Sequence, residues 1–319
     1  MNTTTSQSTL APSITKAASQ QTYYTIRFLV DRGRVTDAYR AYAYFRWVDD
    51  ALDAGNFTRS VTNAVEAQQR TAFLERQKSL LEKCYRGESF ADATAEEDML
   101  IELVKQDHEK NSGLQSYLRL MMQVMDFDAK RRGRLISQVE LNEYTHWLAS
   151  AVTEAMHYFI GHGCSSPRDE TRYLAVTAAH ITHMLRDTYD DVQAGYYNIP
   201  REVLEAAHIQ PHDIHSKGYR RWVQSRVKLA RQYFTAGRRY LDQVEEPRCR
   251  LAGLAYTARF EWVLDTIEQE DYSLRPEYNE RKGLGAGLQM GLLTLSSIMK
   301  LGGRQPSPQP IISQPLRKL

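Results

Sequence analysis

Two segments far apart in the chain each carry a pair of aspartates at helical spacing. Asp49 and Asp53 form the first pair, and Asp187 and Asp191 form the second. At about 100° per residue, the members of a pair fall about 40° apart on a helix, so their carboxylates share one face. Mg²⁺ takes oxygen ligands and typically uses one or two carboxylates together with substrate phosphates and water. Two such faces opposite each other are what a magnesium–diphosphate site requires.

The neighbours of the aspartate pairs support a site rather than a solvated surface. Arg46 and Arg186 stand just upstream of the two pairs, and arginine binds phosphate oxygens with two parallel hydrogen bonds. A single D-x-x-x-D on a helix is usually exposed to solvent. Here the first pair is surrounded by aromatic residues and the second follows an apolar turn. Acidic groups in apolar helices need partners or metals.

Composition limits the class of protein. The chain has 319 residues, of which 42% are hydrophobic and 25% charged, enough for one large domain. A net charge of +2 gives no general affinity for nucleic acid, so we predict no nucleic-acid partner. The three cysteines are widely spaced and form no C-x-x-C motif. Few, widely spaced cysteines are typical of proteins in a reducing compartment, so we predict a cytoplasmic protein.

Apolar residues recur at helical spacing through most of the chain, and no alternating strand pattern is present. The nine predicted helical segments are 36–54, 60–85, 93–109, 113–131, 138–162, 168–195, 218–245, 247–271 and 278–300. We therefore predict a single all-α domain over residues 21–300, between disordered tails at 1–20 and 301–319. The longest uncharged stretch, 283–299, is shorter than a membrane span and is predicted to be a core helix.

Several motifs resemble those of the squalene/phytoene synthase family, over about Thr22 to Tyr272. Met184–Pro200 resembles the family's L-R-D-x-x-E-D-x-x-x-G-R-x-Y-L-P signature, and Tyr42–Asp53 is similar to its Y-x-x-x-R-x-x-D-D-x-x-D. The weaker matches are Glu140–Tyr144 with E-L-x-x-Y, Met125–Asp126 with a Met-Asp pair, and Leu264–Tyr272 with I-L-D-x-I-x-x-x-x-Y.

The resemblance implies the all-α isoprenoid synthase fold, with helices around a central cavity. It implies a Mg²⁺-dependent prenyltransferase that joins two farnesyl (C15) or geranylgeranyl (C20) diphosphates head to head. The reaction passes through a cyclopropylcarbinyl diphosphate to a C30 or C40 hydrocarbon such as squalene, dehydrosqualene or phytoene. NADPH is left open, because squalene synthases of the family need it and dehydrosqualene and phytoene synthases do not. The water-insoluble product suggests peripheral contact with a membrane surface.

The resemblance also implies a set of site residues. Those expected to hold Mg²⁺, or alternatively Mn²⁺, are Asp49, Asp50, Asp53, Asp187, Asp190, Asp191 and His183. Those expected in catalysis and substrate binding are Arg46, Arg186, Tyr42, Tyr144, Tyr23, Val152, His180, His183 and Phe260.

The chain departs from the family pattern within this set. His180 and His183 stand where the family has glutamine and asparagine, and Phe260 replaces a tyrosine. Tyr196 and Asn198 replace the arginine and the tyrosine of G-R-x-Y-L-P. One hypothesis is that the histidines bias the site toward Mn²⁺ or Co²⁺, since imidazole suits transition metals. We favour the simpler interpretation that they donate hydrogen bonds to the diphosphate or to the neighbouring aspartate.

Three other functions are compatible with the same acidic segments. A terpene-synthase-like lyase would ionise and cyclise one prenyl diphosphate. A partial-reaction enzyme would stop at the cyclopropyl diphosphate. A non-enzymatic assembly factor is the third, although such relatives tend to lose the acidic motifs that this chain keeps. Counting the diphosphates released per product separates the three enzymes.

Overall fold

Helices form nearly all of the part of the chain that the structure describes, as the apolar spacing predicts. The computed structural model describes residues 3–53 and 63–278, and within these ranges it contains no strand. The helices are α1 (Thr3–Ala18), α2 (Gln20–Leu29), η1 (Arg32–Arg34, 3₁₀), α3 (Val35–Asp53), α4 (Asn63–Tyr85), α5 (Ala95–Lys105), α6 (Gly113–Arg131), α7 (Gln138–Phe159), α8 (Thr171–Arg186), α9 (Thr188–Ala194), α10 (Arg201–Ala207), α11 (Lys217–Leu241) and α12 (Pro247–Gln269). The all-α prediction is confirmed.

Local sequence explains where several helices begin and end. At the start of α7, Ser137 and Glu140 form a capping box: the Ser137 hydroxyl accepts from the Glu140 amide at 3.2 Å, and the Glu140 carboxylate accepts from the Ser137 amide at 2.7 Å. These bonds satisfy amides that the first helical turn leaves free. Gly195 ends α9 with a φ of 86°, a left-handed conformation that glycine adopts without steric cost.

The helix predicted over 168–195 is two helices in the structure. Helix α8 ends at Arg186, Asp187 has non-helical dihedral angles, and α9 begins at Thr188. Apolar periodicity cannot show such a break, because the spacing of side chains continues through it. The segment predicted over 278–300 and the predicted tail 301–319 lie outside the described residues, except for Tyr278.

The predicted disordered tail over residues 1–20 is wrong for most of its length, because Thr3–Ala18 forms α1. Ala11 and Thr15 on α1 are buried, and Leu10 and Ile14 pack against the main hydrophobic cluster. Polar composition hid this helix, whose few apolar residues recur at the i, i+4 spacing of one face. Helix α1 packs on α3, which carries the first aspartate pair.

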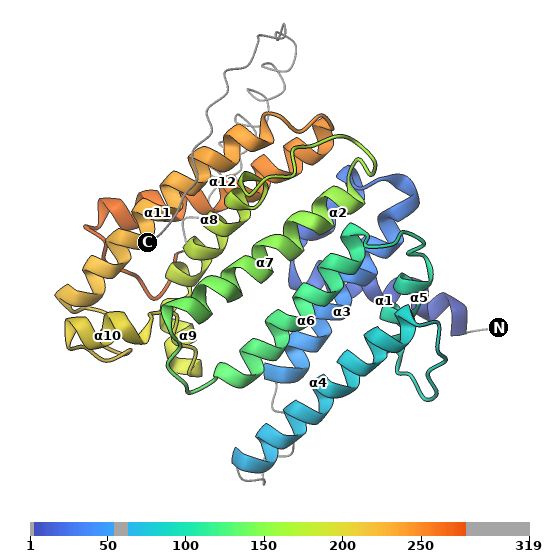
Figure 1. Ribbon diagram of the computed structural model, residues 1–319, viewed down its shortest axis with the longest axis horizontal. Helices are drawn as coiled ribbons and strands as arrows, with labels where there is room; N and C mark the ends of the chain where they lie inside the picture. The colour runs from blue at the N-terminus through green and yellow to red at the C-terminus, as the bar shows by residue number, and fades with distance from the viewer. Residues whose placement is uncertain (1–2, 54–62, 279–319) are drawn as a thin grey trace, which may run out of the picture. The chain divides into compact units, whose positions relative to one another are not determined.

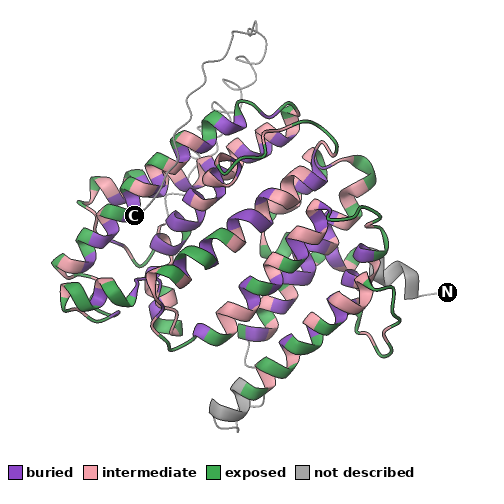
Figure 2. Ribbon diagram, in the orientation of Figure 1, coloured by how far each residue is buried: buried purple, intermediate pink, exposed green. Residues whose placement is uncertain are grey.

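Helices α6, α7 and α8 lie side by side (Figure 1). Helix α3 packs against α6, while α11 and α12 pack against α8. Buried residues face the helix interfaces and exposed residues face outward (Figure 2). This arrangement places the ends of α3, α6 and α8, which carry acidic residues, within one bundle.

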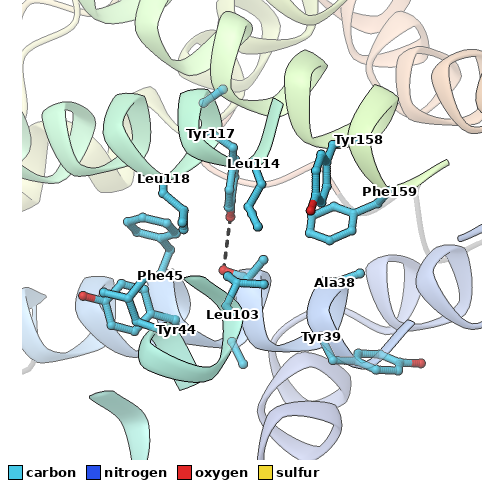
Figure 3. Packing of buried hydrophobic residues seen from close by; sticks show 14 of the residues in the cluster. Ala38, Tyr39, Tyr44, Phe45, Leu103, Leu114, Tyr117, Leu118, Tyr158 and Phe159 are labelled. Atoms are coloured by element: carbon cyan, nitrogen blue, oxygen red, sulfur yellow. Dashed lines mark hydrogen bonds between the residues drawn. The ribbon is translucent and has the colours of Figure 1, made fainter. Parts of the chain in front are cut away.

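The core consists of two large clusters. The first joins α3, α5, α6 and α7, where Phe45, Leu103 and Tyr117 pack together (Figure 3). The Tyr117 hydroxyl donates to the Ala41 carbonyl at 3.2 Å, which satisfies the one polar atom of this buried ring. The second cluster joins α8, α11 and α12. None of the described helices is long and apolar enough to cross a membrane.

Helices α8 and α11 approach each other more closely than side chains normally allow. A Cβ atom placed on Gly237 of α11 would lie 2.5 Å from the backbone nitrogen of Ala175 on α8. Glycine at this position therefore permits backbone-to-backbone contact, and it fixes the position of α8, which leads into the second aspartate pair.

Candidate active site

The first acidic segment occupies the last turns of α3. Arg46 donates to Asp49 Oδ2 at 3.3 Å and also pairs with Asp50, which is exposed. The Asp49 side chain keeps 43% of its surface accessible, so a ligand can reach it. Partial burial and the neighbouring carboxylate of Asp53 raise the pKa of Asp49 to about 6. Two carboxylates this close disfavour each other's charge, and a bound cation would relieve the repulsion.

The second acidic segment lies at the junction of α8 and α9. The Asp191 amide donates to the Asp187 carbonyl at 2.9 Å, so the helical path continues through the junction. Arg186 donates to both Asp187 carboxylate oxygens, at 2.5 and 2.7 Å, and His183 Nε2 lies 2.7 Å from the same carboxylate. Burial alone would raise the pKa of Asp187, but these donors lower it below its usual range. The His183 contact agrees with the hydrogen-bond interpretation of this residue.

Asp128 on α6 lies near both aspartate pairs. Burial and a nearer aspartate raise the pKa of Asp49 to about 6 and the pKa of Asp191 to about 7. The charge of Asp128 makes a smaller contribution to both increases. Such coulombic effects require short separations. The Tyr144 hydroxyl on α7 donates to Asp128 Oδ2 at 2.9 Å. The structure therefore gathers both predicted motifs and Tyr144 around a carboxylate that was not predicted from the sequence.

Arg131 connects Asp128 to the second pair. Its side chain is buried, and its Nε donates to Asp128 Oδ1 at 2.6 Å. Its NH1 group donates to Asn198 Oδ1 at 2.8 Å, and Asn198 Nδ2 donates to Asp191 Oδ2 at 2.7 Å. The guanidinium also lies 4.8 Å from the centre of the Tyr144 ring, within the range of a cation–π interaction. These contacts fix the orientation of Asp191.

Tyr196 links the loop after α9 to the end of α3. Its hydroxyl lies 3.5 Å from Asp53 Oδ1, and its ring centre lies 5.0 Å from the Arg131 guanidinium. Burial, followed by the charge of Asp53, raises the pKa of Tyr196 to about 12, so the hydroxyl is protonated and can donate. Tyr196 occupies the position of the arginine in the family signature, and its ring lies against Arg131 of α6.

The two unusual histidines lie on α8 beside aromatic rings. His180 is 5% exposed, neither of its ring nitrogens has a hydrogen-bond partner, and its ring centre lies 5.2 Å from that of Tyr144. Burial and nearby positive charges hold the pKa of His180 well below its usual value, so the ring is neutral. The His183 ring centre lies 6.0 Å from that of the buried Phe260. These four predicted residues form an aromatic side of the site.

Other predicted residues are not joined to this cluster. Tyr23 packs against Tyr39, with ring centres 5.4 Å apart, and Val152 is half-buried on α7. Asp190 is exposed, and among the described residues it makes no hydrogen bond or ion pair. Tyr42 is half-buried, and burial raises its pKa. Their roles in binding or catalysis stay predictions.

The chemistry of the donor set fits Mg²⁺ that arrives with substrate. Within residues 3–53 and 63–278, no three His, Cys, Asp or Glu side chains converge closely enough to enclose a metal ion. Mg²⁺ rarely uses such a cage and instead combines one or two carboxylates with phosphate oxygens and water. Asp49 with Asp53, and Asp187 with Asp191, supply carboxylates in those numbers.

Asp128 and Arg131 are the site residues that sequence reasoning missed. The family resemblance pointed to Asp126 instead, but Asp126 forms ion pairs with Lys78 and Lys130, each at 2.6 Å. A signal was present, because Asp128 and Arg131 continue the buried apolar stripe of α6 at helical spacing. A charged pair on an apolar face marks either a buried ion pair or a site.

Comparison with known proteins agrees with this geometry. The family model for squalene/phytoene synthase matches residues 15–282. The structure is similar to squalene synthase HpnC from Alicyclobacillus acidocaldarius, with a TM-score of 0.64 and 18% identity, covering 85% of this chain and 96% of that one.

It is also similar to a dehydrosqualene synthase solved in complex with a ligand, with a TM-score of 0.65 and 18% identity, covering 93% of this chain and 97% of that one. No curated protein sequence matches the chain significantly. The structural likeness establishes the isoprenoid synthase fold, and the matched residues include both aspartate pairs. The chain is a prenyltransferase-type enzyme that belongs to the squalene/phytoene synthase family.

Proposed function

We propose that the protein condenses two molecules of farnesyl or geranylgeranyl diphosphate head to head, through a cyclopropylcarbinyl diphosphate, to a C30 or C40 hydrocarbon. The observation that carries this proposal is the convergence of both aspartate pairs near Asp128, at one end of a helical bundle. Head-to-head condensation requires two ionisations of a diphosphate. A single acidic segment would offer fewer carboxylates than two diphosphates with their cations need.

We assign a role to each group from its contacts. Asp49, Asp53, Asp187 and Asp191 would hold Mg²⁺, which neutralises the charge of the leaving diphosphate. Arg186 orients Asp187 through two hydrogen bonds. Arg46 is accessible beside Asp49 and can turn toward a phosphate oxygen.

The aromatic side of the site would protect the reaction. The faces of Tyr144 and Phe260 can stabilise an allylic cation, as aromatic faces stabilise other cations. Their apolar edges exclude water, which would otherwise capture the cation. Tyr42 would extend this wall on α3.

A lyase is the second candidate, and one observation favours it. His180 is neutral and has no hydrogen-bond partner, and its ring lies beside Tyr144. An unprotonated nitrogen at that position could accept a proton from a carbocation, which would end the reaction on a single C15 or C20 skeleton.

A product assay tests the proposal. Pure protein is incubated with Mg²⁺ and each diphosphate separately, released diphosphate is quantified, and extracts are analysed by gas chromatography–mass spectrometry. We expect a C30 or C40 product with two diphosphates released per molecule. One diphosphate per C15 or C20 product would instead support the lyase, and one per cyclopropyl diphosphate would indicate the partial reaction. Parallel incubations with and without NADPH decide whether the product is reduced.

Peripheral membrane contact also stays a proposal, with a narrower basis than the sequence suggested. Of the basic run 131–134, Arg131 is buried, Arg132 donates to the Ala194 carbonyl and Arg134 pairs with Glu140. Arg220 and Arg221 are exposed on the surface of α11, and Arg220 pairs with Asp271 at 3.0 Å. Sedimentation with anionic vesicles, compared between the parent and an Arg220→Gln/Arg221→Gln variant, tests the contact.

A further inference from the structure

Helix α2 presents two large aromatic side chains to solvent. Among residues 3–53 and 63–278, the exposed large hydrophobic side chains are Tyr24 at 47%, Phe28 at 67% and Val139 at 65%. The rings of Tyr24 and Phe28 stack, with their centres 6.1 Å apart and an angle of 8° between their planes. A single exposed apolar residue such as Val139 is ordinary on a protein surface. Two stacked rings form a continuous apolar patch, which is typical of an interaction surface.

Helix α2 carries apolar residues on both of its sides. At about 100° per residue, Tyr24, Arg27 and Phe28 fall within about 100° of one another, and all three are exposed. Ile26 lies on the opposite side and is buried, where α2 packs on α1, α3 and α12. A surface helix that packs on one side normally presents polar residues on the other. The outer face of α2, formed by Tyr24, Arg27 and Phe28, instead combines two rings with a cation.

Positive charge surrounds this outer face. Residues 3–36 contain one acidic residue, Asp31, against four basic ones, Lys16, Arg27, Arg32 and Arg34. The excess of three positive charges in this segment is larger than the net charge of +2 for the whole chain. Arg248 already pairs with Asp31 at 2.8 Å. Lys16, Arg27 and Arg32 are exposed, and within the described part of the chain they form no ion pair. Their charge is therefore available to an anionic partner.

The combination of rings and cations selects an anionic lipid surface. Tyrosine and other aromatic side chains lie favourably among lipid head groups, with their apolar faces toward the acyl chains. Exposed arginine and lysine side chains are attracted to anionic lipids. A second copy of the chain fits less well. A two-fold contact would place the same basic residues against each other, and the outer face of α2 has no carboxylate to pair with them.

Helix α2 also borders the aromatic side of the candidate active site. Arg259 of α12 donates to Gln21 Oε1 of α2 at 3.4 Å. The same guanidinium lies 4.5 Å from the centre of the Phe260 ring. One residue thus connects the inner side of α2 to Phe260, and a lipid surface at the outer face would lie on the far side of this single helix.

We propose that the outer face of α2 docks the protein on an anionic phospholipid bilayer, with the rings of Tyr24 and Phe28 among the head groups and Arg27 beside the lipid phosphates. The inference deepens the membrane contact proposed above by naming its surface. It rests on the proposed function for the reason to bind lipid, since prenyl chains and a C30 or C40 product are apolar. Docking through α2 would let the product pass from the Phe260 side of the site into lipid rather than into water.

Vesicle binding by the full chain tests the proposal. Sedimentation is measured with vesicles of phosphatidylcholine and phosphatidylglycerol in equal parts, without Mg²⁺ or substrate. We expect Tyr24→Ser/Phe28→Ser to weaken binding at least about tenfold, because both rings lose their burial in the interface. Val139→Ser, which removes an exposed apolar side chain from α7, should bind like the parent. Parent vesicle binding that Tyr24→Ser/Phe28→Ser retains in full, or no binding by the parent, would overturn the proposal.

A second pair of variants tests the role of charge. Arg27→Gln and Arg239→Gln each remove one positive charge, from exposed positions on α2 and α11. We expect Arg27→Gln to weaken binding to the anionic vesicles about fivefold, the factor that corresponds to about 1 kcal/mol for a cation at the membrane surface. Arg239→Gln should bind like the parent. If Arg220→Gln/Arg221→Gln loses binding while Tyr24→Ser/Phe28→Ser keeps it, the docking surface is on α11 and the proposal is wrong.

Fluorescence locates the contact without removing the aromatic patch. Phe28→Trp keeps a ring on α2 and adds an indole, which brominated phosphatidylcholine quenches on contact. We expect greater quenching in Phe28→Trp than in Val139→Trp, because Val139 lies on α7. Equal quenching in the two variants would contradict docking through α2.

The oligomeric state is the remaining control. Analytical ultracentrifugation of the parent without lipid that shows a dimer, together with a monomer for Tyr24→Ser/Phe28→Ser, would assign the outer face of α2 to a second copy instead. None of these measurements needs turnover. They therefore succeed or fail separately from the product assay that tests the proposed function.

Discussion

Gly237 of α11 lies against the backbone of Ala175 of α8, with no room for a side chain between them. A Cβ atom on Gly237 would approach the Ala175 nitrogen to 2.5 Å and its Cα to 2.7 Å. Ala175 Cβ obstructs the same position at 2.6 Å, and none of the three atoms can turn away as the end of a flexible side chain could. The close packing of α11 on α8, which carries His180 and His183, therefore depends on the absence of one methyl group.

We expect Gly237→Ala to lower the free energy of unfolding by about 1–3 kcal/mol, the usual cost of forcing extra volume into a packed interface. Urea denaturation followed by circular dichroism measures the change. Gly33→Ala is the matched control, because no atom lies within 4 Å of a Cβ placed there. A stability of Gly237→Ala within about 0.5 kcal/mol of the parent, the scatter of ordinary surface substitutions, would contradict the close approach.

Asn198→Leu tests the link between Arg131 and Asp191. The substitution removes the donor to Asp191 and one of the two acceptors of Arg131, which keeps its bond to Asp128. We expect a loss of about 1–3 kcal/mol in the free energy of unfolding. We also expect kcat/KM to fall at least about tenfold, because Asp191 loses its fixed orientation. Asn142→Leu on the exposed side of α7 is the control. Parent-like kcat/KM in Asn198→Leu would show that Asp191 needs no such support.

Paired substitutions on α9 separate the aspartates. Asp191 lies near Asp187 and Asp128, whereas Asp190 is exposed and makes no hydrogen bond or ion pair with the described residues. We expect Asp191→Asn to reduce kcat at least about 100-fold, because metal Lewis-acid catalysis supplies several kcal/mol. Asp190→Asn should cost less than about tenfold. Equal losses in the two variants would place Asp190 among the metal ligands, as the family resemblance predicts.

Metal removal tests the role of the α8 histidines. After EDTA treatment and gel filtration, we expect diphosphate release to stop and Mg²⁺ to restore it fully. His183 already contacts Asp187, so we expect Mn²⁺ and Co²⁺ to give no higher kcat than Mg²⁺. A preference for Mn²⁺ or Co²⁺ that disappears in His183→Asn would show that the imidazole ligates the metal instead.

His157 makes stability depend on pH. The Tyr240 hydroxyl lies 2.9 Å from His157 Nε2 and also accepts from Arg172, so it can donate to the unprotonated ring nitrogen. Burial, followed by the charge of Arg172, lowers the pKa of His157 from 6.5 to about 4. Between these values the unfolded chain binds more protons than the folded one.

Above about pH 6.5, His157 makes its full contribution to the free energy of unfolding. This contribution decreases as the pH falls toward about 4. The loss is at most about 3.5 kcal/mol, because each unit of pKa difference corresponds to about 1.4 kcal/mol. We expect His157→Gln to flatten this part of the curve in urea titrations at several pH values. His108→Gln, at an exposed position, should follow the parent curve. A parent-like slope in His157→Gln would assign the acid sensitivity to other groups.

The sequence predicted the helical class and the two aspartate pairs because both depend on local spacing. Side chains four residues apart share a helix face wherever the helix lies, so Asp49 and Asp53 can be paired from their spacing alone. The break at Asp187 and the order of α1 could not be predicted in this way. Both depend on tertiary packing, which the apolar pattern of a short segment records only weakly.

Long-range contacts were the hardest part to predict. The charge of Asp128 affects the pKa values of Asp49 and Asp191 only because the fold brings α3, α6 and α9 near one another. Asp126 matches a family motif, yet it forms ion pairs with Lys78 of α4 and Lys130 of α6.

The bond between Arg131 and Asn198 constrains how this enzyme could have diverged. Arg131 lies against Tyr196 and bonds Asn198, the two positions where the family signature has arginine and tyrosine. Restoring arginine at 196 alone would put a second guanidinium beside the first, and restoring tyrosine at 198 would remove the acceptor of a buried charge. Residues coupled in this way do not change independently without a loss of stability. These three positions should therefore be inherited as a unit, and lineages that share Arg131 should share its two partners.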